Sequence, residues 1–126
     1  MIGKEKLLDI LNQALKWSEA DQTLICCYFT LDRVTRFHNF RIHQDIEESD
    51  VGIYFKIDLD GRIGVSSTNS LKPQDLKDAL KEAIKIAKVS PKPKVKFKFP
   101  SGEAVPLVTT YYPSTIEFSF EQRIRD

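Results

Sequence analysis

Two histidines in a polar, aromatic stretch are the residues of this sequence best suited to chemistry. His38 and His43 match neither the i, i+4 spacing of a helical zinc peptidase site nor the spacing of a Cys/His finger. If their segment is a strand, Arg41, His43 and Asp45 share one face, and Asp45 could orient the imidazole of His43. We therefore expect these three side chains either to contact a substrate or to be ordinary surface residues of a strand.

Other groups in the sequence fall short of a complete site. The run that begins at Asp58 and ends at Gly61 resembles the start of a calcium loop, but Ile63 occupies a later ligand position, so calcium is not expected. Cys26 and Cys27 are adjacent, which predicts two reduced thiols in a buried or half-buried strand. We predict neither a catalytic site nor a metal site in this chain alone.

A lysine-rich segment offers a different function. Residues 85–98 contain six lysines and no acid, with Phe97 between two of the lysines and Phe99 directly after the last. The lysines are Lys85, Lys88, Lys92, Lys94, Lys96 and Lys98. Cations beside stacking rings would suit single-stranded nucleic acid, whereas lysines on an exposed edge strand at 94–99 would simply prevent aggregation. The whole chain has 19 Lys+Arg and 18 Asp+Glu, so nucleic acid is the less favoured partner.

The elements that must position these residues are those of an α+β domain. Residues 23–30 are almost entirely apolar and predict a central strand that is covered on both faces. Two further strands connect near His38 and Asn39, and another strand runs over 51–58. Asp60-Gly61 predicts a type I′ turn into a return strand, so residues 23–68 form an antiparallel meander.

Two amphipathic helices flank this meander in the sequence. The first covers residues 4–18. The second starts at Pro73, which suits the first helical position, and ends before Pro91. Its predicted core-facing residues are Leu76, Ala79, Leu80, Ala83, Ile84 and Ala87. We therefore expect two helices packed against the meander sheet.

The carboxyl-terminal part is less regular. Residues 107–112 are compatible with a short strand, and the residues from Ser119 to Gln122 have the form of a helix capping box. A helix that starts this close to Asp126 suggests that the sequence is one piece of a longer polypeptide. We therefore divide the chain into an α+β domain, residues 1–90, and a Lys-rich edge strand with an extended tail, residues 91–126.

The overall composition restricts the class of protein. The chain has 126 residues, 41% of them hydrophobic and 29% charged, which fits one globular domain. No apolar run approaches the roughly 20 residues that span a membrane, and the amino terminus lacks the pattern of a signal peptide. We expect a cytoplasmic protein that has no membrane partner.

Three segments together resemble a known family. They are Thr35-Arg-Phe-His-Asn-Phe-Arg-Ile-His-Gln44, the hairpin around Asp60-Gly61-Arg62-Ile-Gly64-Val-Ser-Ser-Thr-Asn69, and Leu71-Lys-Pro-Gln-Asp-Leu76 at the start of an Ala/Ile-rich helix. In this order and spacing they look like the amino-terminal domain of the TldD/PmbA family, once labelled modulator of DNA gyrase. The resemblance covers about residues 5–90. Lys72 differs from the acidic helix cap that is frequent in the family, and the lysines at 92–98 are untypical.

The resemblance implies a cytoplasmic zinc metallopeptidase system whose paired subunits process peptides or degrade unfolded ones. The family's zinc ligands belong to a His-Glu-x-x-x-His helix in a later domain, and this sequence contains no such motif. We therefore carry no catalytic or metal-binding residue over to this chain. The expected partners are an unfolded or extended peptide and either a homologous subunit or a second copy. A stand-alone binding or dimerisation module with a basic Lys85–Lys98 face is the alternative.

Overall fold

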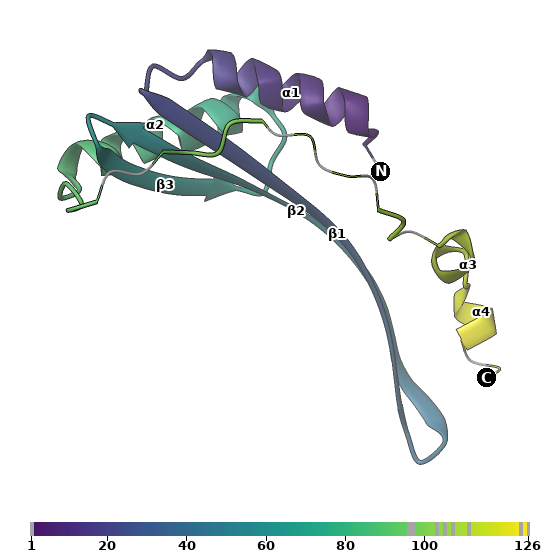
Figure 1. Cartoon of the computed structure of the whole chain (residues 1–126). Coiled ribbons are helices and arrows are strands. Elements are labelled where there is room, and N and C mark those ends of the chain that lie inside the picture. Colours follow the sequence, from purple (N-terminus) through teal and green to yellow (C-terminus); the bar gives the residue numbers. More distant parts are fainter. Residues whose placement is uncertain are drawn as a thin grey trace. The chain divides into compact units, whose positions relative to one another are not determined.

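The fold of the chain comes from a computed structural model, shown in Figure 1. It describes residues 2–95, 98–102, 104, 106, 108–110, 112–123 and 125. The order of the elements is α1, β1, β2, β3, α2, α3 and α4. One three-stranded antiparallel sheet and two long helices dominate the described residues, which confirms the α+β class.

The three strands follow one another across the sheet. β1 is Gln22–His38, β2 is Arg41–Leu59 and β3 is Arg62–Thr68. The strand order β1-β2-β3 makes β2 the middle strand, so the predicted meander is confirmed. β2 and β3 pair antiparallel, from Ile53 opposite Thr68 to Leu59 opposite Arg62.

Two details of the predicted sheet are wrong. The apolar segment 23–30 belongs to β1, which lies at one edge of the described sheet and not in its centre. The predicted breaks on either side of the polar stretch are absent, because β1 and β2 run through it as continuous strands. Strand pairing uses backbone groups, so polar side chains do not end a strand, and an apolar run does not fix the order of strands.

Both predicted turns are present. Asn39 and Phe40 have φ values of 49° and 57°, and they connect β1 to β2. Asp60 and Gly61 have φ values of 53° and 73°, and they connect β2 to β3. Positive φ at both central residues is the signature of a type I′ hairpin turn. Phe40 adopts this conformation although aromatic side chains rarely do so.

The contacts of the chain divide it into two units. Unit 1 comprises Met1–Phe29 and Asp50–Pro100, and unit 2 comprises Thr30–Ser49 and Ser101–Asp126. β1 and β2 each contribute residues to both units. We describe each unit by itself, and the sequence division at residue 90 stays a prediction.

The core of unit 1 lies between the sheet and the two long helices. α1 is Lys4–Lys16 and α2 is Pro73–Val89, with Pro73 at the helix start as predicted. Ile53, Phe55 and Ile57 alternate along β2 and are fully buried. The predicted stripe of α2 meets them, with Leu76, Ala79, Leu80, Ala83 and Ala87 buried and Ile84 packed against the cluster. The second helix and its core face are therefore confirmed.

A close approach of α2 to β3 depends on Gly64. A Cβ atom at this position would overlap the carbonyl oxygen of Ala83 and lie 2.7 Å from the backbone nitrogen of Ala87. Nearby, the hydroxyl of Ser66 donates to the carbonyl oxygen of Ala79 over 2.5 Å. The helix can lie this near the strand only because residue 64 has no side chain.

The segment after α2 is not the predicted edge strand. Residues 94, 95, 98 and 99 have no strand geometry, while 96 and 97 lie outside the described residues. The backbone N–H of Phe99 donates to Gln22 Oε1 over 2.9 Å, and Lys56 Nζ lies 5.7 Å from the centre of the Phe99 ring. Lys56 alternates with the core residues of β2, so this segment covers the sheet face opposite the helices (Figure 1). The backbone N–H of Phe99 is therefore satisfied by a side chain and not by pairing with a strand.

The tail in unit 2 contains two short helices, α3 at Pro113–Ile116 and α4 at Phe120–Arg123. The backbone N–H of Ser119 donates to Gln122 Oε1 over 2.7 Å, and that of Gln122 donates to Ser119 Oγ over 3.3 Å. This reciprocal pair confirms the capping box. The strand predicted at 107–112 is not found at residues 108–110 or 112, and residues 107 and 111 lie outside the described part.

None of the helices in the described part of the chain has the length and apolar character required to cross a membrane.

Candidate functional site

The hairpin residues of unit 2 are joined across β1 and β2 by polar side chains. Arg33 Nε donates to Glu47 Oε2 over 2.6 Å, and its Nη1 donates to the carbonyl oxygen of Ile116 in α3 over 2.7 Å. Farther along the hairpin, Arg36 Nη1 donates to Gln44 Oε1 over 2.7 Å. These bonds fix the two strands of the hairpin to each other and to the tail within the same unit.

Arg123 of α4 joins two residues of the hairpin in this unit. Its Nη2 lies 3.1 Å from Asp45 Oδ1, and its Nε donates to Thr35 Oγ1 over 2.9 Å. The Thr35 hydroxyl in turn donates to Asp45 Oδ1 over 2.5 Å. The side chains of Arg123 and Asp45 are only 18% and 25% exposed, so water screens this ion pair less than a surface pair.

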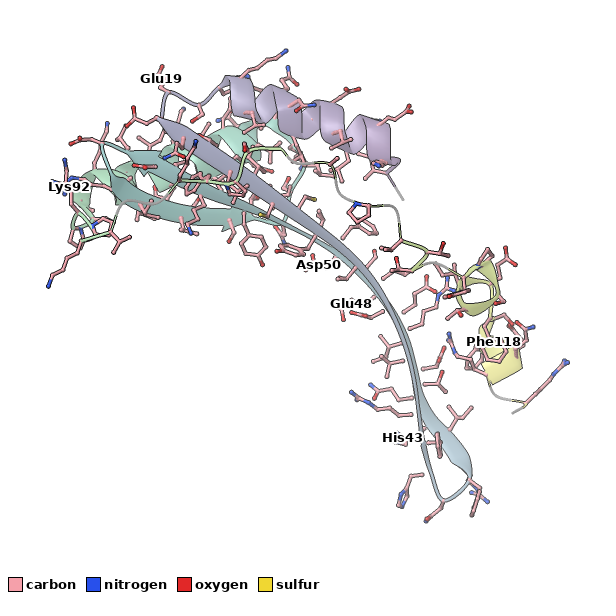
Figure 2. The ribbon with its side chains drawn as sticks, viewed as in Figure 1. Glu19, His43, Glu48, Asp50, Lys92 and Phe118 are labelled. Carbon is pink, nitrogen blue, oxygen red and sulfur yellow. The ribbon has the colours of Figure 1, made fainter. Side chains whose placement is uncertain are left out.

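The predicted trio of Arg41, His43 and Asp45 does not act as one group. All three lie on β2, but the carboxylate of Asp45 binds Thr35 and Arg123 and not His43. Arg41 and His43 are exposed, and neither side chain makes a hydrogen bond or ion pair within the described residues. Figure 2 labels His43 on the hairpin. Asp45 therefore does not orient the imidazole. Substrate contact by these residues stays a prediction.

Apolar side chains form the more distinctive feature of unit 2. Phe37 is 74% exposed and Phe40, at the turn, is fully exposed. Together with Ile42 and with Phe118 of the tail, they line a pocket of about 520 Å³ (Figure 2 labels Phe118). Thr35, Arg123 and Arg125 supply its polar wall. Exposed aromatic residues beside arginine are typical of protein and peptide interfaces.

Sequence reasoning missed Phe37, Phe40 and Arg123 as site residues. A signal was present for Phe40 only, because an aromatic residue in a two-residue turn cannot be covered by its own hairpin. No comparable signal existed for Arg123. Its partner Asp45 is 78 positions away in the sequence.

Catalytic chemistry is not assigned to the described residues. No three of their His, Cys, Asp or Glu side chains form a group that could hold a metal ion. Cys26 and Cys27 are free, half-buried thiols in β1, as predicted. Burial raises the pKa of the Cys27 thiol, which disfavours the nucleophilic thiolate.

The lysines of the segment 85–98 lie partly on α2 and partly after it, and two of them form ion pairs. Lys85 on α2 pairs with Glu82, with Nζ 3.1 Å from Oε2, and Lys92 pairs with Asp60, with Nζ 2.7 Å from Oδ2. Lys96 and Phe97 lie outside the described residues. Part of the charge on this segment is thus neutralised by acids from elsewhere in unit 1.

Comparison with known proteins finds a family match for part of the chain. Residues 32–87 match the family model described as PmbA/TldA metallopeptidase domain 1. This match includes the hairpin of unit 2 together with β3 and most of α2. A search of the curated proteins gave no match.

Two solved structures share the fold. TldE from Thermococcus kodakarensis is 20% identical with a TM-score of 0.64, over 82% of this chain and 24% of that protein. A proposed modulator of a DNA gyrase from Thermotoga maritima is 16% identical with a TM-score of 0.66, over 94% of this chain and 27% of that protein. The chain thus spans about a quarter of the length of each structure.

The solved structures show a shared fold, and the family match shows that residues 32–87 are similar to the first domain of metallopeptidases of this family. More specifically, the match over residues 32–87 and the shared fold support the resemblance to the amino-terminal domain of the PmbA/TldD family that the sequence segments predicted.

Proposed function

We propose that this chain is the non-catalytic amino-terminal domain of a PmbA/TldD-type zinc metallopeptidase that processes or degrades unfolded peptides in the cytoplasm. In this proposal zinc and the reacting groups belong to another part of the full polypeptide. The chain's own contribution is a surface that contacts extended peptide substrate. The family match supports this division of roles, because the family model that matches residues 32–87 describes the first domain of a metallopeptidase.

The observation that carries the proposal is the exposure of aromatic side chains at the hairpin. Phe37 and Phe40 border the pocket of unit 2, and Arg123 and Arg125 stand beside them. Unfolded peptides differ from folded proteins in presenting apolar side chains together with free backbone carbonyl groups. Aromatic rings can pack against the apolar side chains, and arginine N–H groups can donate to the free carbonyl groups.

A second candidate role for the same surface is contact with another subunit. Phe40 is fully exposed at the turn between β1 and β2, and a single exposed aromatic side chain is a typical anchor for a pocket on a partner protein. Peptide binding and subunit contact predict different effects when Phe40 is changed.

Fluorescence anisotropy of a labelled, unstructured peptide titrated with the full chain tests the proposal. We expect the double variant Phe37→Ser, Phe40→Ser to bind at least about fivefold more weakly, because each buried aromatic contact contributes on the order of 1 kcal/mol or more. Val89→Ser is the matched control, since Val89 is 83% exposed but lies on α2 in unit 1. Equal affinity of all three proteins would contradict peptide binding at this surface.

Analytical ultracentrifugation of the same proteins measures their mass in solution and distinguishes subunit contact from peptide binding. If the wild-type chain self-associates and only the double variant becomes monomeric, with no change in peptide affinity, the surface serves subunit contact. If peptide affinity falls and the mass in solution is unchanged, it serves the substrate.

A further inference from the structure

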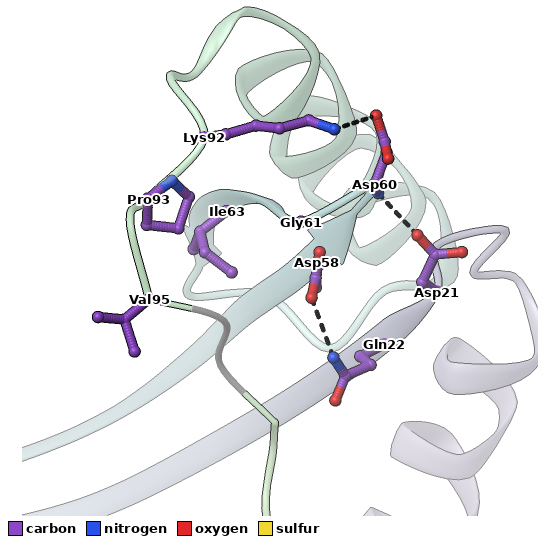
Figure 3. Close-up of a pocket in the computed structure, with 9 residues that line it drawn as sticks. All are labelled: Asp21, Gln22, Asp58, Asp60, Gly61, Ile63, Lys92, Pro93 and Val95. Carbon is purple, nitrogen blue, oxygen red and sulfur yellow. Dashed lines mark hydrogen bonds and ion pairs between the residues drawn. The ribbon is translucent and has the colours of Figure 1, made fainter.

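A second pocket, in unit 1, is lined by three carboxyl groups and has no role in the function proposed above. Its volume is about 420 Å³ (Figure 3). Asp58 and Asp60 come from the end of β2 and its turn, Asp21 from just before β1, and Lys92 from the segment after α2. Three acids face a single ammonium group here, so the pocket favours an additional positive charge.

Two of the three acids already have partners within the unit. Asp60 Oδ2 lies 2.7 Å from Lys92 Nζ, and Asp21 Oδ2 accepts a hydrogen bond of 2.7 Å from the backbone N–H of Asp60. The first contact shows that this wall of the pocket can hold an alkyl ammonium group. The second fixes the turn that carries Asp60.

Asp58 is different, because it is buried and half of its carboxyl group has no partner. The residue is 7% exposed, and its Oδ2 accepts a hydrogen bond of 2.9 Å from Gln22 Nε2. Its Oδ1 has no hydrogen-bond partner among the described residues. Figure 3 shows one oxygen turned toward Gln22 and the other turned away from it. Buried carboxyl oxygens nearly always accept a hydrogen bond, so this atom calls for a donor from outside the unit.

The remaining walls of the pocket are apolar. Ile63 of β3 lines it together with Pro93 and Val95 of the segment after α2 (Figure 3). A carboxyl group at the base of a pocket with aliphatic walls matches a ligand that has a hydrocarbon stem and a cationic head. Lysine and arginine side chains have this chemistry, and they supply the N–H donors that Asp58 Oδ1 lacks.

We propose that this pocket binds the side chain of a lysine or arginine residue of a peptide, with Asp58 accepting a hydrogen bond from its cationic head. A bare metal ion is the less suitable occupant, because no group of three potential ligands among the described residues is arranged to hold one. All the residues involved belong to unit 1, so this inference does not depend on the peptide surface of unit 2.

Nuclear magnetic resonance titration of the full chain tests the assignment with small probes. The cationic probes are Nα-acetyl-lysine methylamide and Nα-acetyl-arginine methylamide, and the neutral probe is Nα-acetyl-norleucine methylamide. We expect the cationic probes to shift the methyl resonances of Ile63 and Val95 and the neutral probe to leave them unchanged. Asp58→Asn should weaken binding of the cationic probes at least tenfold.

Glu82→Gln is the matched control, because it removes the same charge from an exposed position on α2 and should leave the affinity unchanged. If Asp58→Asn does not fold, the methyl shifts of the wild-type chain still decide the question. Equal binding of the neutral probe would overturn the proposal. The proposal would also be overturned if 1,5-diaminopentane bound to the pocket and neither of the two cationic methylamide probes did. Displacement of both cationic probes by millimolar Ca²⁺ would overturn it as well.

Discussion

Arg123 in the last short helix binds Asp45 in the second strand, with Nη2 3.1 Å from Oδ1, across 78 positions of sequence. Asp45 is the residue that the sequence pattern associates with His43, two positions away on the same strand. In the structure, the carboxylate of Asp45 instead accepts hydrogen bonds from Arg123 and from the hydroxyl of Thr35. A guanidinium has several N–H donors, so it can bind the carboxylate and the hydroxyl together.

We expect Arg123→Met to loosen the tail of unit 2 while leaving unit 1 intact. The change keeps the aliphatic stem and removes the donors to Asp45 and Thr35, an effect of about 1–2 kcal/mol on local opening for bonds that involve charged groups. Amide hydrogen exchange at residues 113–123 should become about 5- to 30-fold faster. Arg125→Met is the control in the same tail. Unchanged exchange in the Arg123 variant would contradict a holding role for this ion pair.

Gly64→Ala tests the close approach of α2 to β3. The new methyl group would overlap the carbonyl oxygen of Ala83, so strand and helix must separate. We expect a loss of about 1–3 kcal/mol or more in the free energy of unfolding, measured by urea denaturation. Gly3→Ala is the control, because a Cβ atom there meets nothing within 4 Å and its φ of −72° suits any residue. Equal losses in both variants would show that the spacing at Gly64 is not the cause.

Lys92→Met should raise the pKa of Asp60 toward its ordinary value. The hydrogen bond and the charge of Lys92 hold the pKa of this carboxyl below its usual range. A lowered folded-state pKa contributes stability above the ordinary pKa of aspartate, and that contribution disappears as the pH falls through the folded-state value. A carboxyl-detected titration of Asp60 measures the change. The pKa of Asp60 should not move in Lys85→Met, whose partner is Glu82.

Cys27 should react slowly with iodoacetamide in the folded chain. Its pKa is raised by burial, so less thiolate is present at neutral pH than at an ordinary cysteine, and the rate should increase as the pH rises. The variant Cys26→Ala leaves Cys27 as the only thiol, and mass spectrometry then follows its alkylation in the folded and urea-unfolded chain. Similar rates in both states at neutral pH would contradict a protective effect of burial.

Much of the fold follows from local sequence signals. The stripe from Leu76 to Ala87, Pro73 at the helix start and the Asp60-Gly61 turn each depend on neighbouring residues only, and the structure contains all three. The capping box at Ser119 and Gln122 belongs to the same class. Such signals are reliable because helix periodicity and turn geometry are set within a few residues.

The predictions that proved wrong concern contacts between distant segments. The strand order of the apolar segment 23–30 depends on which strands pair, and the fate of residues 94–99 depends on contacts such as that between Phe99 and Gln22. An alternating pattern of lysine and apolar residues is equally compatible with an edge strand and with an irregular segment over a sheet. Only the tertiary contacts distinguish these two outcomes.

The sequence by itself determined the two long helices, both turns and the family resemblance, because each of these is encoded in short segments and their order along the chain. The tertiary structure decided which side chains became partners. Asp45 binds Arg123, and Asp58 is buried with one carboxyl oxygen that has no donor among the described residues. Partner choice depends on chain closure over tens of residues, and no local pattern specifies the distance between side chains that are so far apart in sequence.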